Sequence, residues 1–214
     1  MELTTIASGS TGNCYILTAE NGRKILLDCG VKLQTIITNK NFGWLRDYEF
    51  VYVSHSHKDH CKSMKELEHY GAKIVSYLDP VLKPTKMGQF IIKMFKIKHN
   101  VENYGIVIID TLTKERFCYV TDFCELPQIT GIDTLLMEVN YDLDIINDRI
   151  DKWGLDGLNS GFSNHFSLQQ AEDWLVHNPT NIKNLIICHI SKDNANREKI
   201  LKTLTPLADN VRLA

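Results

Sequence analysis

The sequence predicts an α/β fold in which strands pack as two sheets with helices outside them. Three observations support this prediction. Apolar runs of strand length recur along the whole chain, and helical patterns are fewer and spaced through both halves. The composition, with 214 residues, 43% hydrophobic and 23% charged, suits a compact domain with a sizeable core. Since no repeat, low-complexity segment or linker interrupts the chain, residues 1–214 are interpreted as a single domain.

Nine segments are predicted to be strands, because apolar residues fill them, several are rich in β-branched or aromatic residues, and many end at Gly, Asn or Asp. In chain order they are Tyr15–Thr18, Lys24–Asp28, Phe50–Ser54, Lys73–Tyr77, Phe90–Phe95, Tyr104–Asp110, Phe117–Thr121, Thr134–Val139 and Leu185–Cys188. The polar stretch Thr111–Glu115 separates the sixth segment from the seventh and predicts a hairpin there.

Three segments show helical patterns and end at residues that stop helices. They are Ser63–Tyr70, which ends at a glycine, and Ser167–His177 and Asn194–Leu204, which both end shortly before a proline. Ser167 is a good N-cap, and Gln170 three residues later completes a capping box.

Charge and cysteine content exclude several classes of protein. The 24 Lys and Arg residues nearly balance the 26 Asp and Glu residues, which disfavours a protein that coats nucleic acid duplexes. No apolar run approaches the roughly 20 residues of a membrane span, and the start shows no secretory signal. The six cysteines form no CxxC pair and are interpreted as reduced thiols. We therefore expect a cytoplasmic protein, in the host cytoplasm if the chain is phage-encoded.

The strongest local signal is a histidine-rich loop directly after a predicted strand. It reads Ser54-His55-Ser56-His57-Lys58-Asp59-His60. His55 and His57 point the same way only in extended backbone, while Asp59 and His60 would turn toward a second ion. Imidazole with carboxylate suits zinc, manganese or iron rather than calcium. The alternative, a solvated loop, is disfavoured by so demanding a spacing.

This loop resembles the signature of the metallo-β-lactamase superfamily. The resemblance implies a four-layer αββα sandwich with a two-metal site along one edge of the sheets. Four further residues fall on the superfamily's other motifs in the right order. They are Asp28, His99, Asp122 and His189.

The resemblance implies two divalent ions, zinc or manganese, held by seven ligands. One ion would take His55, His57 and His99, the other would take Asp59, His60 and His189, and Asp122 would bridge them. Asp28 is interpreted as a residue that orients the histidine loop rather than as a ligand. If His99 or His189 occurred alone, it would be interpreted as a structural histidine, and Asp122 alone would be interpreted as a turn residue. Their occurrence together, in the order of the superfamily motifs, favours metal binding.

Other residues favour the superfamily members that cleave phosphodiesters. Asp122 stands where common β-lactamases carry a cysteine ligand. In ribonuclease Z a Glu and a His form a proton-relay pair, and Glu138 and His165 match their places. The resemblance therefore implies that His165 is a general acid held by Glu138, although it would alternatively cap a helix. Asp59 is counted with the catalytic residues as well as with the ligands.

Three motifs resemble the YycJ/WalJ-like branch and the phage anti-Pycsar enzymes: Ser8–Tyr15, Asn164–Ser167 and His189–Asn194. They imply a two-metal phosphodiesterase that hydrolyses nucleotides, with a cyclic mononucleotide as the favoured substrate. One alternative is a DNA or RNA nuclease of the YycJ/WalJ exonuclease type, which lysines such as Lys83, Lys86, Lys93, Lys96 and Lys98 would serve. Another is a non-catalytic, metal-bound sensor.

Two expectations concern assembly and the remaining histidines. The resemblance to ribonuclease Z and the anti-Pycsar enzymes implies a homodimer. The segment Tyr141–Ser160 is too long for an idle loop and is expected either to cover the pocket or to reach the partner subunit. His69 and His177 lie in the last turns of predicted helices, where a cation is favoured, and are interpreted as structural.

Overall fold

The computed structural model describes residues 1–154, 163–178 and 181–214, and their strands form two sheets. The first sheet has the order β1 (Glu2–Ala7), β2 (Cys14–Thr18), β3 (Lys24–Leu27), β4 (Tyr48–Val53) and β5 (Ile74–Ser76). β2 pairs with β1 and with β3 in antiparallel fashion, whereas β3, β4 and β5 run parallel to one another.

The second sheet has seven strands in the described part of the chain. Its order is β12 (Asn210–Leu213), β11 (Asn184–Cys188), β10 (Thr134–Glu138), β9 (Arg116–Val120), β8 (Asn103–Asp110), β7 (Phe90–Ile97) and β6 (Thr85–Met87). The four strands β9 to β12 are parallel, and β6 to β9 are antiparallel. The predicted hairpin at 111–115 joins β8 to β9 and is confirmed.

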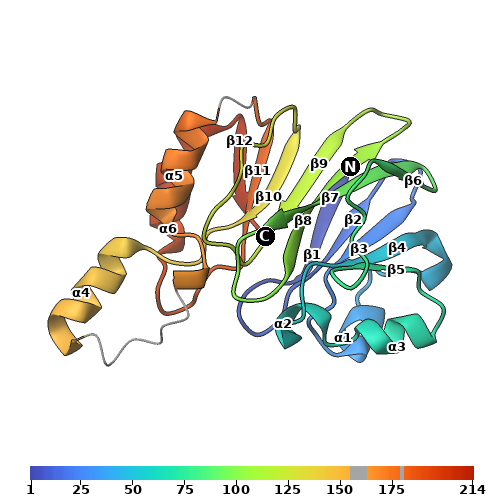
Figure 1. The fold of residues 1–214 in the computed structure, drawn as a ribbon, viewed down its shortest axis with the longest axis horizontal. Coiled ribbons are helices and arrows are strands. Elements are labelled where there is room, and N and C mark those ends of the chain that lie inside the picture. The colour runs from blue at the N-terminus through green and yellow to red at the C-terminus, as the bar shows by residue number, and fades with distance from the viewer. Residues whose placement is uncertain (155–162, 179–180) are drawn as a thin grey trace.

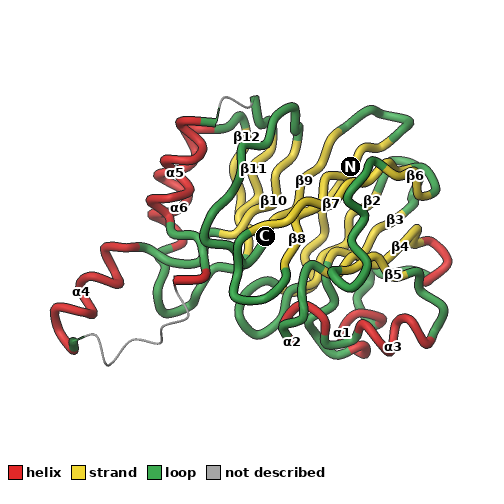
Figure 2. The backbone as a smooth tube through the Cα atoms, in the orientation of Figure 1, coloured by secondary structure: helices red, strands yellow, loops and turns green. Residues whose placement is uncertain are grey.

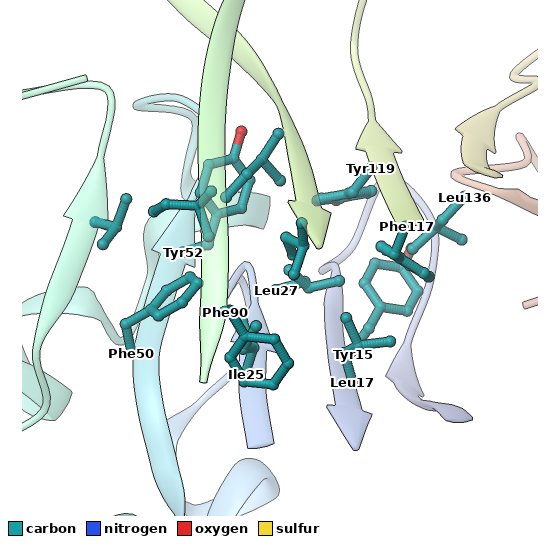
Figure 3. Close-up of a cluster of buried hydrophobic side chains, with 14 of the residues drawn as sticks. Tyr15, Leu17, Ile25, Leu27, Phe50, Tyr52, Phe90, Phe117, Tyr119 and Leu136 are labelled. Atoms are coloured by element: carbon teal, nitrogen blue, oxygen red, sulfur yellow. The ribbon is translucent and has the colours of Figure 1, made fainter. Parts of the chain in front are cut away.

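Helices cover the outer face of each sheet (Figure 1). The first sheet carries α1 (Leu33–Ile37), α2 (Lys58–Cys61) and α3 (Met64–His69), and the second carries α5 (Leu168–His177) and α6 (Arg197–Leu204). Short 3₁₀ helices lie at Leu45–Asp47 and Thr205–Leu207. One apolar cluster fills the space between the two sheets (Figure 3). A second cluster lies between the first sheet and its helices, and a third lies between the second sheet and its helices. The predicted four-layer αββα sandwich is confirmed.

All nine predicted strands and all three predicted helices are present, and their bounds differ by one to three residues. The Ser167–Gln170 capping box is also present. Three strands were missed because β1 and β12 are half-exposed edge strands and β6 has three residues. The helices α1 and α2 have five and four residues, too few to show a period.

A further helix, α4 (Leu143–Trp153), occupies the first part of the segment predicted to cover the pocket or reach a partner. Asp142 caps it by accepting from the Asp144 N–H, and Arg149 donates to Asn194 at 2.6 Å. Figure 1 shows α4 projecting from the rest of the chain. The remainder of that predicted segment, residues 155–160, lies outside the described residues, so its role stays a prediction.

The strands that precede the candidate ligands all end at one edge. β3 and β4 are parallel in the first sheet, and β9, β10 and β11 are parallel in the second. Figure 2 shows loops gathered along the lower edge of both sheets. In open α/β sheets the carboxyl ends of parallel strands are where ligands bind. Among the described residues, none of the helices has the length and apolar content to cross a membrane.

Candidate metal centre

The first ligand group consists of His55, His57 and His99. The first two follow β4, and His99 follows β7. His57 Nδ1 lies 3.3 Å from His99 Nε2, and His55 Nε2 lies 3.6 Å from a carboxylate oxygen of Asp122. Each of these four residues offers one ligand atom within 4.8 Å of the others, so a single ion fits among them.

The second ligand group consists of Asp59, His60 and His189. Asp59 and His60 lie on α2, and His189 follows β11. Asp59 Oδ2 lies 3.4 Å from His60 Nε2 and 3.3 Å from His189 Nε2. Asp122 joins this group as well, within the same 4.8 Å limit. The structure therefore brings all seven predicted ligand residues together in two adjoining groups.

Asp122 presents one oxygen to each group. Its Oδ2 lies 3.6 Å from His55 Nε2 and 4.0 Å from His99 Nε2. Its Oδ1 lies 3.2 Å from His60 Nε2 and 3.6 Å from His189 Nε2. This is the arrangement that a carboxylate bridging two ions requires.

The donor set fits divalent metal ions of the kind that imidazole and carboxylate bind. His55 Nε2 is buried and has no hydrogen-bond partner among the described residues. A buried polar atom without a partner is unfavourable, and coordinating a cation would give His55 Nε2 the partner that it lacks. The residues therefore fit both zinc and manganese.

Electrostatics differ between the two groups in the metal-free protein. Burial and the neighbouring His60 lower the pKa of His55 to about 2, and burial also lowers the pKa of His99. Burial opposes charge on His189 too, but Asp122, Asp59 and Glu138 outweigh it and raise its pKa to about 10. The carboxylates Asp122 and Asp28 likewise outweigh burial and raise the pKa of His60.

Asp28 contacts the second group from behind, in the place expected of a residue that orients the loop. It is fully buried, and its Oδ2 accepts from His60 Nδ1 at 2.6 Å. The Ser54 N–H donates to its Oδ1 at 2.8 Å. Because Nδ1 donates to Asp28, Nε2 is the His60 nitrogen that faces Asp59 and Asp122, and the Asn13 side-chain amide also contacts it at 3.1 Å.

Three site residues have left-handed backbone conformations at strand ends. The φ values are 56° for Asp28, 52° for Asp122 and 52° for His189. Such values are uncommon outside glycine, and strained residues of this kind cluster at functional sites.

Glu138 contacts two histidines through one oxygen. Its Oε1 lies 2.5 Å from His165 Nδ1 and 3.0 Å from His189 Nδ1. Its Oε2 accepts from the Phe123 N–H at 3.1 Å. Burial opposes charge on His165, but Glu138 outweighs it and raises the pKa of His165. The predicted pair is thus in contact, and it is also linked to a ligand of the second group.

Sequence reasoning missed several residues that hold the ligands. Asn140 donates to the His189 carbonyl at 2.8 Å, and the Ser8 hydroxyl accepts from the His189 N–H at 3.1 Å. The Asn13 N–H donates to the Asp59 carbonyl at 2.7 Å. The motif at 8–15 marked Ser8 and Asn13 without indicating a role, and no sequence signal marked Asn140.

Gly30 allows the end of β3 to approach α2. A Cβ atom at Gly30 would lie 1.6 Å from the Asp59 carbonyl oxygen, so only glycine fits. The adjacent Cys29 N–H donates to the His60 carbonyl at 2.8 Å. His69 and His177 lie outside both ligand groups, and none of the six cysteines forms a disulfide.

Comparisons with known proteins concern the fold and the N-terminal part of the chain. The sequence model of the anti-Pycsar protein Apyc1 family matches residues 5–76 of the 214, which include the histidine loop. Among curated proteins, no sequence matches the chain.

Solved structures resemble the chain over almost its full length. The metallo-β-lactamase fold protein YhfI from Bacillus subtilis has 17% identity and a TM-score of 0.75, covering 99% of this chain and 95% of that one. Human tRNase Z, short form (ELAC1), has 16% identity and a TM-score of 0.65, covering 100% and 96%. Unliganded yeast PDE1 has 11% identity and a TM-score of 0.68, covering 99% and 96%. The chain has the metallo-β-lactamase fold, and its N-terminal part resembles the anti-Pycsar family.

Proposed function

We propose that the chain is a metal-dependent hydrolase that cleaves nucleotide phosphodiester bonds with two divalent ions. The observation that carries this proposal is Asp122, whose two oxygens face two separate ligand groups. The resemblance to the anti-Pycsar family and the shared fold with tRNase Z and PDE1 support it.

Zinc or manganese ions at these residues would supply a water nucleophile near neutral pH and offset the phosphate charge. His55, His57 and His99 would hold one ion, and Asp59, His60 and His189 the other. Asp122 would fix the separation between them. Asp59 is the more exposed of the two carboxylates in this set, with 24% of its side chain accessible against 3% for Asp122.

His165 would donate a proton to the leaving oxygen. Glu138 accepts from its Nδ1, so a protonated imidazole keeps its Nε2 proton available. The raised pKa of His165 favours that protonated form near neutral pH. The His165 side chain is 19% exposed, whereas Glu138 is fully buried, as expected when one residue meets the substrate and the other holds it.

A cyclic mononucleotide is the substrate that we propose first. The anti-Pycsar match supports it, as does the near-neutral charge of the chain. The nuclease alternative relied on exposed lysines, but Lys96 pairs with Glu102 at 3.0 Å and Lys98 pairs with Glu125. These partners offset part of the positive charge that a polynucleotide would need. An intact ligand set with a His–Glu pair argues against a sensor without turnover.

A substrate panel tests this proposal. The protein, loaded with Mn²⁺ or Zn²⁺, is assayed on cyclic mononucleotides and on 5′- or 3′-labelled DNA and RNA oligonucleotides. We expect hydrolysis of at least one cyclic mononucleotide, abolished in Asp122→Ala and retained in the matched control His177→Ala. Cleavage of oligonucleotides alone would favour the nuclease, and no turnover of either class would reject the enzyme.

We also propose a homodimer, on the strength of the resemblance alone. Light scattering across micromolar concentrations tests it. A monomer mass throughout that range would reject the dimer without affecting the proposed chemistry.

A further inference from the structure

A buried tyrosine contacts the candidate metal centre from inside the sandwich. Tyr119 lies on β9, is fully buried, and its hydroxyl donates to Asp28 Oδ2 at 2.6 Å. The same oxygen accepts from His60 Nδ1 at 2.6 Å and from the Ser54 hydroxyl at 3.0 Å. Asp28 is therefore the single residue between the tyrosine and a ligand of the second group.

The contact joins the two sheets. Tyr119 belongs to the seven-stranded sheet, whereas Asp28 directly follows β3 of the five-stranded sheet. Tyr119 also stands three residues before Asp122 on the same chain segment. The Tyr119 hydroxyl thus connects β9, the strand that leads to Asp122, with Asp28, whose carboxylate orients His60.

The tyrosine ring is held firmly between the sheets. Tyr15 and Tyr52 pack edge-on against it, with ring centroids 5.7 Å and 6.1 Å away (Figure 3). Both neighbours are themselves fully buried. A close-packed aromatic group has little freedom to move, so the Tyr119 hydroxyl is a fixed point for Asp28.

We propose that Tyr119 is a positioning residue for the second metal ion, acting through Asp28 on His60. This inference rests on the proposed function, since it requires an ion at the second ligand group. Without the Tyr119 hydroxyl, Asp28 Oδ2 keeps two donors and stays satisfied, but nothing ties its carboxylate to β9. His60 then loses the constraint that aligns its Nε2 with Asp122. The loss of such outer partners typically weakens metal binding by about 10–100-fold.

The test compares Tyr119→Phe with Tyr48→Phe. Tyr48 is a matched control because it is also buried, and its hydroxyl donates to the Phe42 carbonyl, away from the ligands. Each metal-free protein is titrated with Co²⁺, and the visible absorption and the affinity of each equivalent are recorded. We expect the affinity of one of the two ions to fall about 10–100-fold in Tyr119→Phe, with a changed absorption for that ion. The other ion, and both ions in Tyr48→Phe, should stay within a few-fold of the original protein.

A double-mutant cycle with Asp28→Asn tests the route through Asp28. If Tyr119 acts through Asp28, its loss should add little once Asp28→Asn is present. Fully additive effects on Co²⁺ affinity would contradict that route.

Three further outcomes would overturn the inference, and they are distinguishable. If the original protein binds two ions and Tyr119→Phe binds them equally well, the inference fails while the proposed function stands. If Tyr119→Phe does not fold while Tyr48→Phe does, Tyr119 has a structural role instead. If the original protein binds no more than one Co²⁺, both the inference and the two-metal proposal fail.

Discussion

The two ligand groups of the candidate metal centre are built from opposite surroundings. In the first group, His55, His57 and His99 pack against one another, with ring centroids 4.7 to 5.1 Å apart, and Asp122 is the carboxylate that contacts them. In the second group, the histidines lie among carboxylates. Asp28 contacts His60, and Glu138 contacts His189.

This difference sets the charge of each group before any metal binds. Crowded, buried imidazoles stay neutral, as the low pKa values of His55 and His99 indicate. Imidazoles beside carboxylates hold protons, as the raised pKa values of His60 and His189 indicate. The first group is therefore ready to accept a cation, whereas a cation at the second group must displace protons.

The largest expected effect comes from Asp122→Ala, because this residue serves both groups. We expect both ions to bind weakly and phosphodiester hydrolysis to fall on the order of 10⁴-fold or more, since metal catalysis supplies several kcal/mol. Metal analysis and turnover measure this. If Asp122→Ala lost only one ion and kept most activity, the carboxylate would not bridge the groups.

The next effect concerns His165, which is linked to the second group through Glu138. His165→Ala should slow hydrolysis of a nucleotide diester by about 10²–10⁴-fold, because the ribose alkoxide needs a proton to leave. Bis(p-nitrophenyl) phosphate should be hydrolysed within a few-fold of the original rate, since p-nitrophenolate leaves without help.

Metal content is the control for the His165 variant and should not change. Loss of both reactions together with loss of metal would mean that His165 is a ligand or a structural support. The general-acid assignment would then be wrong.

A smaller effect is expected for Glu138→Gln, and it should weaken metal binding at the second ligand group but not at the first. The shared oxygen of Glu138 contacts both His165 and His189, so its neutralisation alters a proton donor and a ligand together. We expect a weaker form of the His165→Ala selectivity and about 10–100-fold weaker binding of the second ion. Calorimetric titration of each ion would show this, and equal weakening of both ions would contradict the assignment of His189 to one group.

A change of pH tests the same contrast without altering a residue. His189, with its pKa near 10, is protonated at pH 7, so the second ion must release that proton. His60, whose pKa is also raised, adds a second proton, so the affinity of the second ion should rise by up to about tenfold per pH unit for each proton released, from pH 7 toward pH 10. His55 is already neutral and releases none. Calorimetry in buffers of different ionisation enthalpy counts these protons, and equal release by both ions would remove the contrast.

The ligand loop was readable from sequence because its information is local. Two histidines at i and i+2 followed by Asp59 and His60 constrain one short stretch of backbone after a buried strand. The apolar runs were readable for the same reason. Edge strands such as β1 and β12 were missed because half-exposed residues give a weak pattern.

The site beyond that loop depends on contacts between distant parts of the chain. The resemblance to the superfamily and to ribonuclease Z suggested Asp122, Glu138 and His165, but the spacing of these residues could not say which atoms would meet. Asn140 and Tyr119 carry no motif role. Asn140 meets His189 because β10 and β11 lie side by side, and Tyr119 meets Asp28 because the two sheets pack against each other.

The sequence by itself determined the layers of the sandwich and the kinds of atoms available to bind metal, because periodicity and side-chain chemistry are properties of short segments. The tertiary structure decided how those atoms are shared. It turned the two oxygens of Asp122 toward different histidines and set one oxygen of Glu138 against His165 and His189. It also connected Tyr119 across the sheets to Asp28. These contacts join residues far apart in sequence, and their geometry follows from left-handed turns at strand ends and close packing between the sheets.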